Sequence, residues 1–548
     1  MSPSELEGES LMSVRPGKVA MFEQFAADGI TRMFGNPGTV EQGFLDILEQ
    51  VPGFEYVLAL QESAVVGIAD GYARAASAPA LVQLHSGVGL GNGIGMLYQA
   101  MRGHSPLVVV AGEAGVQYDA MNAQMSADLV AMARPVTKYA TRVLHPGSVL
   151  RVLRRAVKTA MTPPRGPVFV SLPMDVLDSP TEEPAVRSTI PSRSVIPTQP
   201  ELAAAAELLI SARAPVILMG DGVAVSGAQR ELTRLAELLD APVWGVDSSE
   251  FNIDTAHPLY RGQLGHMFGT DSARRLADAD AVLIVGTYVF PEVFPALASP
   301  FSDGARLVHV DLDDYEVAKN FPVDVPLVAD PKPTLAALVA RIDGAVPGTG
   351  RAPWNGTYDV PQPRPDAPLA EHFCAELARQ APRDLVIFDE ALTHSGALTR
   401  YLPPRVAGNY FLTRGGSLGV GIPGAIGAKL ARPDAEVVGF TGDGGSMYTI
   451  QALWTAARYG IAAKFVICNN HRYQLLDENI EQYWHERGIV RHATPGGFDL
   501  SHPEIGFTDT ARGLGVDAVR VDKPAAVEEA VRRMLERDGP FLCDLVTA

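Results

Sequence analysis

Short apolar runs that end in Gly, Asp, Asn or His alternate along the chain with longer segments whose apolar positions recur at helical spacing. Buried strands of parallel sheets have this continuous apolar character, and the helices that cover such sheets are amphipathic. The pattern therefore predicts an α/β fold built from mostly parallel sheets flanked by helices. We expect strands at residues 32–34, 56–60, 80–84, 107–111, 168–172, 215–219, 282–286, 307–311, 436–441 and 464–468, and helices at 14–28, 64–76 and 449–459.

Two segments interrupt the alternation and divide it into three blocks. Residues 180–200 are rich in Pro, Ser and Glu, and residues 344–368 are dense in Pro and Gly, as linkers are. The chain of 548 residues is also long enough for about three domains of ordinary size. We predict a disordered tail at 1–13 and three domains, each a mostly parallel sheet flanked by helices, at 14–180, 200–345 and 369–548.

The amino-acid composition limits the binding partners and the cellular compartment that we expect for this protein. The net charge of −18 disfavours binding to nucleic acid or to an anionic membrane surface. The three cysteines include no CxxC pair, which fits a reducing cytoplasm and disfavours a cysteine metal site. No apolar run reaches the roughly 18 residues of a membrane span, and the polar, acidic start MSPSELEGES predicts no signal peptide. We expect a cytoplasmic protein.

The most specific chemical signal lies between Gly442 and Asn470. Asp443 follows the apolar run 436–441 in the sequence GDG, and Asn470 closes Asn-Asn after the run 464–468. The carboxyl ends of parallel strands meet at one edge of a sheet, so these two side chains can approach each other. Carboxylate and amide oxygens suit Mg²⁺, which also binds phosphates, and glycines let backbone N–H groups approach a diphosphate.

A GDG turn alone is a weak signal, because a plain βαβ unit can contain one. The chain provides a comparison in Gly220-Asp221-Gly222, which also follows an apolar run but has no Asn-Asn downstream. We interpret that second GDG as a structural turn.

The GDG-to-NN spacing resembles the thiamine diphosphate (ThDP) motif of 2-oxo acid decarboxylases and their relatives. The segments GNPGT, LALQESAVVGIADGYARA, LHSGVGLGNGIG and GGSLGVGIPGAIGAKLA are most similar to the benzoylformate decarboxylase group of that family. The resemblance implies a pyrimidine-binding domain at 14–180, a middle domain at 200–345 and a diphosphate-binding domain at 369–548. It further implies ThDP- and Mg²⁺-dependent, non-oxidative decarboxylation of a 2-oxo acid through a C2-ylide and an enamine.

The resemblance also assigns roles to individual residues. It implies that Glu62 bonds to N1′ of the cofactor and that His85 and Thr39 act on the substrate. A helix-terminal Glu and a strand-end His are, taken alone, more often structural; His104 and His485 have weaker claims than His85. The implied metal ligands are Asp443, Asn470 and the main-chain carbonyl of Arg472. The other implied cofactor contacts are Thr393, His394, Gly416, Leu418, Gly442, Gly444, Gly445, Ser446 and Tyr473.

Two departures from the benzoylformate decarboxylase pattern bear on the substrate. The first is in residues 286–294, GTYVFPEVF, which lack the second active-site histidine of that group. The second is in the helix after Asn-Asn, which places Leu475, Leu476 and Asn479 toward the pocket of Thr39 and His85. No Arg or Lys matches a pocket position, so a second substrate charge would be unpaired. We expect a neutral, apolar side chain on the 2-oxo acid, aromatic or branched. The sequence assigns no role to Asp477, Glu478 or Trp484. Asp477 and Glu478 fit the solvent-exposed face of the helix.

The sequence leaves alternatives to the decarboxylation reaction open. A carboligase of the acetolactate synthase or acyloin-forming kind would pass the same enamine to an aldehyde or ketone, using the same cofactor contacts. A non-catalytic relative is disfavoured by the joint presence of Glu62, Asp443 and Asn470. The family further implies a homodimer with active sites between subunits, and we expect a homotetramer. The middle domain has no Gly-rich dinucleotide fingerprint, so we expect neither flavin nor acyl-CoA there.

Overall fold

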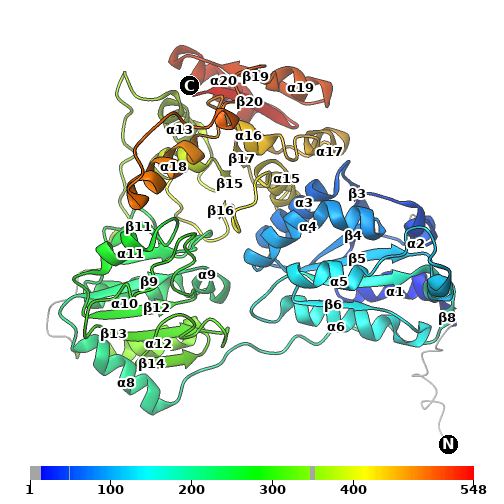
Figure 1. Cartoon of the computed structure of the whole chain (residues 1–548), viewed down its shortest axis with the longest axis horizontal. Coiled ribbons are helices and arrows are strands. Elements are labelled where there is room, and N and C mark those ends of the chain that lie inside the picture. Colours follow the sequence, from blue (N-terminus) through cyan, green and yellow to red (C-terminus); the bar gives the residue numbers. More distant parts are fainter. Residues whose placement is uncertain (1–13, 49, 346–351, 548) are drawn as a thin grey trace, which may run out of the picture. The chain divides into compact units, whose positions relative to one another are not determined.

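The computed structural model describes residues 14–48, 50–345 and 352–547; the tail predicted at 1–13 lies outside these ranges. It contains three six-stranded sheets in which neighbouring strands pair in parallel, and one short antiparallel pair. Helices cover both faces of each sheet (Figure 1). The expected α/β class, with three mostly parallel sheets, is confirmed. Within the described ranges no helix is long and apolar enough to cross a membrane.

The chain forms two compact units, and the first comprises the residues up to Pro191 together with Gly415–Ala431. Its sheet has the order β3-β2-β4-β5-β7-β6. The strands are β1 Arg15–Pro16, β2 Arg32–Gly35, β3 Glu55–Leu58, β4 Ala80–Leu84, β5 Leu107–Glu113, β6 Tyr139–Arg142, β7 Val168–Pro173 and β8 Pro180–Thr181. The helices are α1 Gly17–Ala27, α2 Gln42–Leu48, α3 Glu62–Ala76, α4 Ser86–Arg102, α5 Leu129–Ala133, α6 Val149–Met161, α7 Met174–Asp178 and α15 Gly421–Ala431, with the short 3₁₀ turns η1 Thr39–Glu41, η2 Val116–Met121, η3 Arg134–Val136 and η4 Pro146–Ser148.

The first helix starts later than its apolar pattern suggested. The expected range was 14–28, whereas α1 begins at Gly17, because Pro16 pairs with Pro180 in the β1–β8 ribbon. The segment after β8, expected to be a linker, is bonded to α1. Its Ser188 N–H donates to Asp28 at 2.6 Å, and its Val186 carbonyl accepts from Gln24 at 2.7 Å.

Helices α3 and α15 pack backbone against backbone within the first unit (Figure 1). A Cβ atom on Gly71 would collide with the main chain of Gly424, and one on Gly427 would collide with the main chain of Ile68. Gly71 in GIADG and Gly427 in GIPGAIG are therefore required by the close approach of these helices. This packing fixes the helix whose first residue is Glu62.

The second unit, 192–414 with 432–548, holds the other two sheets. The middle sheet has the order β11-β10-β9-β12-β13-β14, and its strand β12 is buried along its whole length, as expected for a parallel strand covered on both faces. The strands are β9 Pro215–Met219, β10 Val243–Val246, β11 Tyr260–Leu264, β12 Ala281–Val285, β13 Arg306–Asp311 and β14 Val325–Val328. The helices are α8 Gln199–Ile210, α9 Gly222–Ser226, α10 Gln229–Leu239, α11 Gly269–Leu276 and α12 Pro331–Ile342.

The last sheet has the order β16-β15-β17-β18-β20-β19, with β17 and β18 side by side in its centre. The helix expected at 449–459 is shorter, because the residues after β17 first form the separate turn α16. The strands are β15 Val386–Glu390, β16 Tyr410–Leu412, β17 Val437–Gly442, β18 Lys464–Asn469, β19 Asp517–Val521 and β20 Phe541–Val546. The helices are α13 Leu369–Gln380, α14 Ser395–Tyr401, α16 Asp443–Ser446, α17 Ala452–Arg458, α18 Gln474–Arg487, α19 Phe507–Gly513 and α20 Val527–Glu536, with the 3₁₀ turns η5 Leu392–His394, η6 Gly496–Phe498 and η7 Pro524–Ala526.

Candidate active site

Glu62 is the first residue of α3, and its carboxylate is held by two amides. Asn36, which follows β2, donates to Oε1 at 3.1 Å, and Asn92 on α4 donates to Oε2 at 3.0 Å. The residue is 6% exposed. Because each oxygen accepts a separate hydrogen bond, the carboxylate plane is fixed by two elements that the sheet brings together at its carboxyl edge.

His85 lies at the end of β4, where it forms the N-cap position of α4. Its Nδ1 is 2.7 Å from Oε2 of Glu41, a fully buried carboxylate in the turn η1. Oε1 of Glu41 accepts from the backbone N–H groups of Ser86, at 3.2 Å, and Gly112, at 2.8 Å. Burial raises the pKa of Glu41, while the bonds to His85 and to the two backbone groups oppose this. Both oxygens of Glu41 therefore have hydrogen-bond partners within the protein.

Two glycines bring Glu62 and His85 to one place. A Cβ on Gly38 would collide with the imidazole ring of His85, so that ring lies directly on the Gly38 backbone. A Cβ on Gly89 would lie 3.1 Å from Cβ of His85 and 3.2 Å from Oε1 of Glu62. The acid and the imidazole therefore flank the same point of α4, at the carboxyl edge of the sheet.

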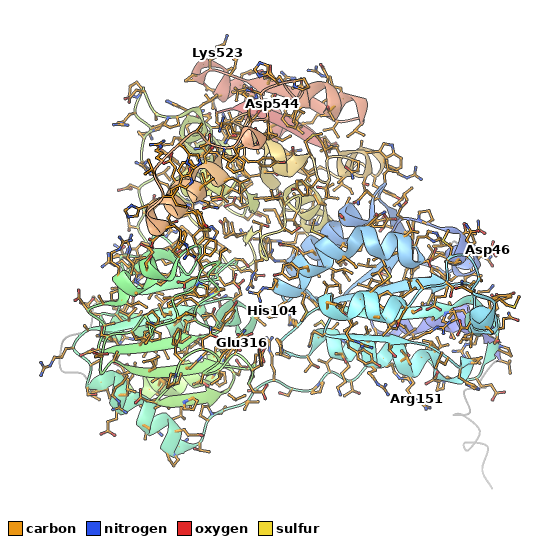
Figure 2. All side chains as sticks on the ribbon, viewed as in Figure 1. Asp46, His104, Arg151, Glu316, Lys523 and Asp544 are labelled. Atoms are coloured by element: carbon orange, nitrogen blue, oxygen red, sulfur yellow. The ribbon has the colours of Figure 1, made fainter. Side chains whose placement is uncertain are left out.

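The other expected residues of the first unit take no part in the contacts described above. Thr39 starts η1 and is exposed, one residue after Gly38. Gly416 is exposed at φ +72° with open space where a side chain would be, and Leu418 is half-buried nearby in the chain. His104 follows α4 at the end opposite His85, roughly 25 Å away along this helix, and its Nδ1 is 3.2 Å from the carbonyl of Arg165 (Figure 2). It takes no part in this cluster.

In the second unit, Asp443 and Asn470 meet as their places at the ends of β17 and β18 predict. The backbone N–H of Arg472 donates to Oδ2 of Asp443 at 3.2 Å and to Oδ1 of Asn470 at 3.0 Å. Oδ1 of Asp443 also accepts from Gly444 N–H at 2.7 Å. Asp443 is 3% exposed, and burial raises its pKa. One donor thus holds a carboxylate oxygen and an amide oxygen side by side.

This pair fits Mg²⁺ in ligand chemistry. Among the described residues no group of three or more His, Cys, Asp or Glu side chains could hold a metal ion. A site here would combine the carboxylate of Asp443 with the amide oxygen of Asn470 and a main-chain carbonyl, the oxygen ligands that Mg²⁺ prefers. The guanidinium of Arg472 does not compensate Asp443, because it forms a two-bond ion pair with Asp477 at 2.7 and 2.9 Å. A cation would offset the burial of Asp443.

The expected diphosphate contacts around Asp443 are buried in the turn between β17 and α17. Gly444 lies against the ring of Tyr473, which a Cβ at this position would strike. Ser446 is buried and donates its hydroxyl to the Asp443 carbonyl at 2.7 Å. A Cβ on Gly445 would lie 3.3 Å from Thr441 Oγ1, whereas Gly442 has open space. The open side of this turn is therefore at Gly442.

The turn η5, which adjoins α18, carries Thr393 and His394. Both side chains are half-buried, and Oγ1 of Thr393 lies 3.3 Å from Nδ1 of His394. Burial lowers the pKa of His394, which favours its neutral form. The buried carboxylate of Asp389 holds the turn by accepting from Ala391 N–H and Ser395 Oγ, each at 2.8 Å.

Helix α18 follows the metal loop directly. Leu475 and Asn479 are half-buried on it, while Leu476 is 41% exposed. The previously unassigned Asp477 ties the helix to Arg472, and this pairing lowers its pKa. Trp484 is buried, 4.5 Å between ring centroids from His492, and His485 is exposed. Asp477 and Trp484 therefore support the helix, and the leucines remain available to line a pocket.

The second GDG behaves as a structural turn. Asp221 accepts from the backbone N–H groups of Ser249, at 2.9 Å, and Glu250, at 3.0 Å, and from the Asn252 amide at 2.8 Å. It also forms a buried ion pair at 2.8 Å with Arg414. Asp221 is thus paired with a buried guanidinium, whereas the hydrogen bonds to Asp443 described above come from backbone N–H groups.

Three residues of the site were not identified from the sequence. Asn36, Asn92 and Glu41 lie within or beside the quoted segments GNPGT and LHSGVGLGNGIG. An Asn in a Gly-rich segment is also typical of turns, so its type alone carries no functional signal. Glu41 could have been identified from its position at the sheet edge where β4 ends in His85, because a charged residue at this edge needs a partner.

Comparisons with known proteins match three segments of the chain to domains of one enzyme family. Residues 16–132, 202–338 and 393–545 match, respectively, the thiamine pyrophosphate enzyme N-terminal TPP binding domain, central domain and C-terminal TPP binding domain. The chain is 34% identical over 543 residues to the benzoylformate decarboxylase of Pseudomonas aeruginosa, covering 96% of this chain and 98% of that one. A probable acetolactate synthase large subunit of Methanococcus aeolicus is 27% identical over 559 residues, covering 96% and 91%.

A solved structure is similar over the same length. The thiamine diphosphate-dependent 4-hydroxybenzoylformate decarboxylase of Rhodococcus jostii RHA1 superposes with a TM-score of 0.87 at 31% identity, covering 97% of this chain and 99% of that one. Fold, motif spacing and full-length similarity agree, and the chain belongs to the thiamine pyrophosphate enzyme family.

Proposed function

We propose that this enzyme decarboxylates 2-oxo acids that carry an apolar aromatic or branched side chain, using ThDP and Mg²⁺. The observation that carries the proposal is the Glu62 carboxylate, fixed by Asn36 and Asn92 beside His85. The names of the Pseudomonas aeruginosa and Rhodococcus jostii relatives support the reaction and the substrate class.

Bound ThDP would supply a carbanion centre that attacks the 2-oxo group and an electron sink for the loss of CO₂. The chain's own residues position this chemistry and move protons. Glu62 exchanges a proton with N1′ of the aminopyrimidine, and its two amide partners keep the carboxyl group in one plane for that contact. His85 gives a proton to, or takes one from, the reacting oxygen or carbon.

The diphosphate would be held through Mg²⁺. Asp443 and Asn470 provide two oxygen ligands, and the main-chain carbonyl of Arg472 is the proposed third. Gly442 leaves room beside them for phosphate oxygens. Thr393, His394 and Tyr473 complete the proposed contacts, while the Asp477–Arg472 ion pair keeps α18 next to the metal loop.

A carboligase is the second candidate, favoured by similarity to the Methanococcus aeolicus acetolactate synthase subunit. Both reactions share the step in which CO₂ leaves and differ in whether a proton or a carbonyl compound then reacts. The test is a panel of 2-oxo acids with and without acceptor aldehydes, read by CO₂ release and product mass. An aldehyde product alone supports the decarboxylase, and a hydroxyketone favours the carboligase.

The same panel carries a prediction about substrate charge. We expect kcat/KM for benzoylformate and branched aliphatic 2-oxo acids to exceed that for dicarboxylic or phosphorylated 2-oxo acids by at least about 100-fold, roughly 2.7 kcal/mol. The proposed lining of Thr39, His85, Leu475, Leu476 and Asn479 offers no Arg or Lys, so a second negative charge would be buried unpaired. Preference for a dicarboxylic acid would refute this pocket and leave the ThDP assignment intact.

Assembly gives a further prediction. Glu62 and Asp443 belong to separate compact units, and the family resemblance implies active sites between two subunits. We propose a homodimer that pairs into a homotetramer, located in the cytoplasm, where its three buried, free cysteines stay reduced. Light scattering of the active holoenzyme should give a dimer mass or a multiple of it. A monomer with full turnover would contradict the shared site.

A further inference from the structure

The contact between Glu41 and His85 defines which ring nitrogen of the histidine faces the reaction. Nδ1 is 2.7 Å from Oε2 of Glu41, and the ring lies on the Gly38 backbone. Among the residues that the structure describes, none bonds to Nε2. The Glu41 side is closed by the fully buried carboxylate, so Nε2 is the nitrogen left to meet a substrate.

The two oxygens of Glu41 have different partners, and this difference fixes the direction of the bond to His85. Oε1 accepts from two backbone N–H groups, those of Ser86 and Gly112. A Cβ on Gly112 would lie 2.7 Å from Oε1, so the carboxylate is seated against this strand and cannot turn over freely. Oε2 is therefore the oxygen presented to Nδ1, and an ionised carboxylate can only accept.

We propose that Glu41 is a positioning residue that keeps a proton on Nδ1 of His85 and so leaves Nε2 as the nitrogen that takes and returns protons in the reaction. The idea rests on the proposed function, in which His85 transfers protons. When Nε2 takes up a proton, the imidazolium forms next to a buried negative charge that stabilises it. When Nε2 gives the proton back, the ring returns to the neutral form protonated at Nδ1.

The isosteric change Glu41→Gln reverses this arrangement. The two backbone N–H groups need an oxygen opposite them, so the Gln amide oxygen takes the place of Oε1 and its NH₂ group faces His85. Nδ1 must then accept, and the neutral ring carries its proton on Nε2. Such a ring cannot accept a proton at Nε2, although size, packing and fold are preserved.

The test combines a tautomer measurement with kinetics on the full-length holoenzyme. In ¹⁵N-histidine NMR, with His85 assigned by its loss in His85→Ala, the wild type should show Nδ1 protonated and Nε2 unprotonated. Glu41→Gln should exchange the two and lower kcat about 100-fold or more, with ThDP affinity within a few fold. In the His85→Ala background Glu41→Gln should cause no further loss, because Glu41 acts through that ring.

Several outcomes would overturn the proposal. These are a neutral wild-type His85 protonated on Nε2, an unchanged tautomer or kcat in Glu41→Gln, and losses that multiply in the double variant. The matched control is Glu113→Gln, a buried glutamate at the end of β5 that pairs with Arg142 at 2.6 Å instead of His85. It should leave the His85 resonances and kcat unchanged. If the wild type decarboxylates no 2-oxo acid, the proposed function fails, while the tautomer measurement still decides the role of Glu41.

Discussion

Glu62→Gln is expected to lower kcat by about 100-fold or more while ThDP still binds with near wild-type affinity. The glutamine can occupy the same volume but cannot exchange a proton with N1′ of the aminopyrimidine. The effect should therefore fall on turnover, and on the activation of the cofactor at C2, more than on binding.

The two amides that hold Glu62 add to this expectation. Asn36 and Asn92 each donate an N–H to one carboxylate oxygen. A glutamine has only one oxygen, so its NH₂ group would face an amide donor unless that Asn turned over. We expect the variant to lose one of the two bonds as well, and the side chain to lose its fixed plane.

The measurement is hydrogen–deuterium exchange at C2 of bound ThDP, followed by NMR, together with calorimetric ThDP affinity. Glu113→Gln again serves as the control for loss of a buried carboxylate in the same sheet. A wild-type exchange rate in Glu62→Gln would show that another group activates the cofactor. A joint loss of binding and exchange would instead indicate a structural role at the start of α3.

The fold and the approach of Asp443 to Asn470 were predictable because each rests on a local pattern. The apolar runs gave parallel strands, and parallel strands bring their carboxyl ends to one edge, so the approach of Asp443 and Asn470 followed from position alone. The structure adds the means of contact, the Arg472 N–H that both oxygens share. Glu62 was singled out through the family resemblance, since an acid between a strand and a helix is, taken alone, more often structural.

The supporting residues could not be predicted, because their contacts join separate turns. Glu41 reaches His85 across 44 positions of sequence, and Asn92 reaches Glu62 across 30. No periodicity relates such residues, and Asn or Glu in a polar turn has an ordinary local explanation. The ends of helices also could not be predicted where a residue pairs with a distant segment. Pro16, for example, belongs to β1 and does not start a helix.

The residues of this site differ in how far the sequence alone determines their positions. Strand-end positions are dictated by the backbone, whereas side-chain partners depend on which turns and helices the fold brings together, as η1 with the end of β4 and α4 with the start of α3. Gly38 lies against the ring of His85, and Gly89 lies against His85 and Glu62. The same glycines leave no room for substitution beside these two groups.

Asp443→Ala is expected to weaken ThDP binding by at least about 100-fold, with a matching loss of the dependence on Mg²⁺. Removing a residue that only supports a ligand typically costs 10- to 100-fold in metal affinity, so removing a ligand should reach at least that range. Alanine also removes the acceptor that fixes Gly444 N–H and half of the bond pair of Arg472 N–H, which loosens the loop that carries Asn470.

The variant Asp443→Asn keeps the size and shape of the side chain and removes its negative charge, while its single amide oxygen can keep one of the two backbone bonds, from Gly444 N–H or from Arg472 N–H. If the charge binds Mg²⁺, Asp443→Asn should resemble Asp443→Ala in calorimetry with ThDP and Mg²⁺. The control is Asp544→Asn on β20 (Figure 2), a buried aspartate of the same sheet whose oxygen accepts from Asn469 at 2.9 Å, a bond that asparagine can also accept. Unchanged ThDP affinity in both Asp443 variants would remove the metal site, and equal losses in the Asp544 control would reduce the effect to general destabilisation.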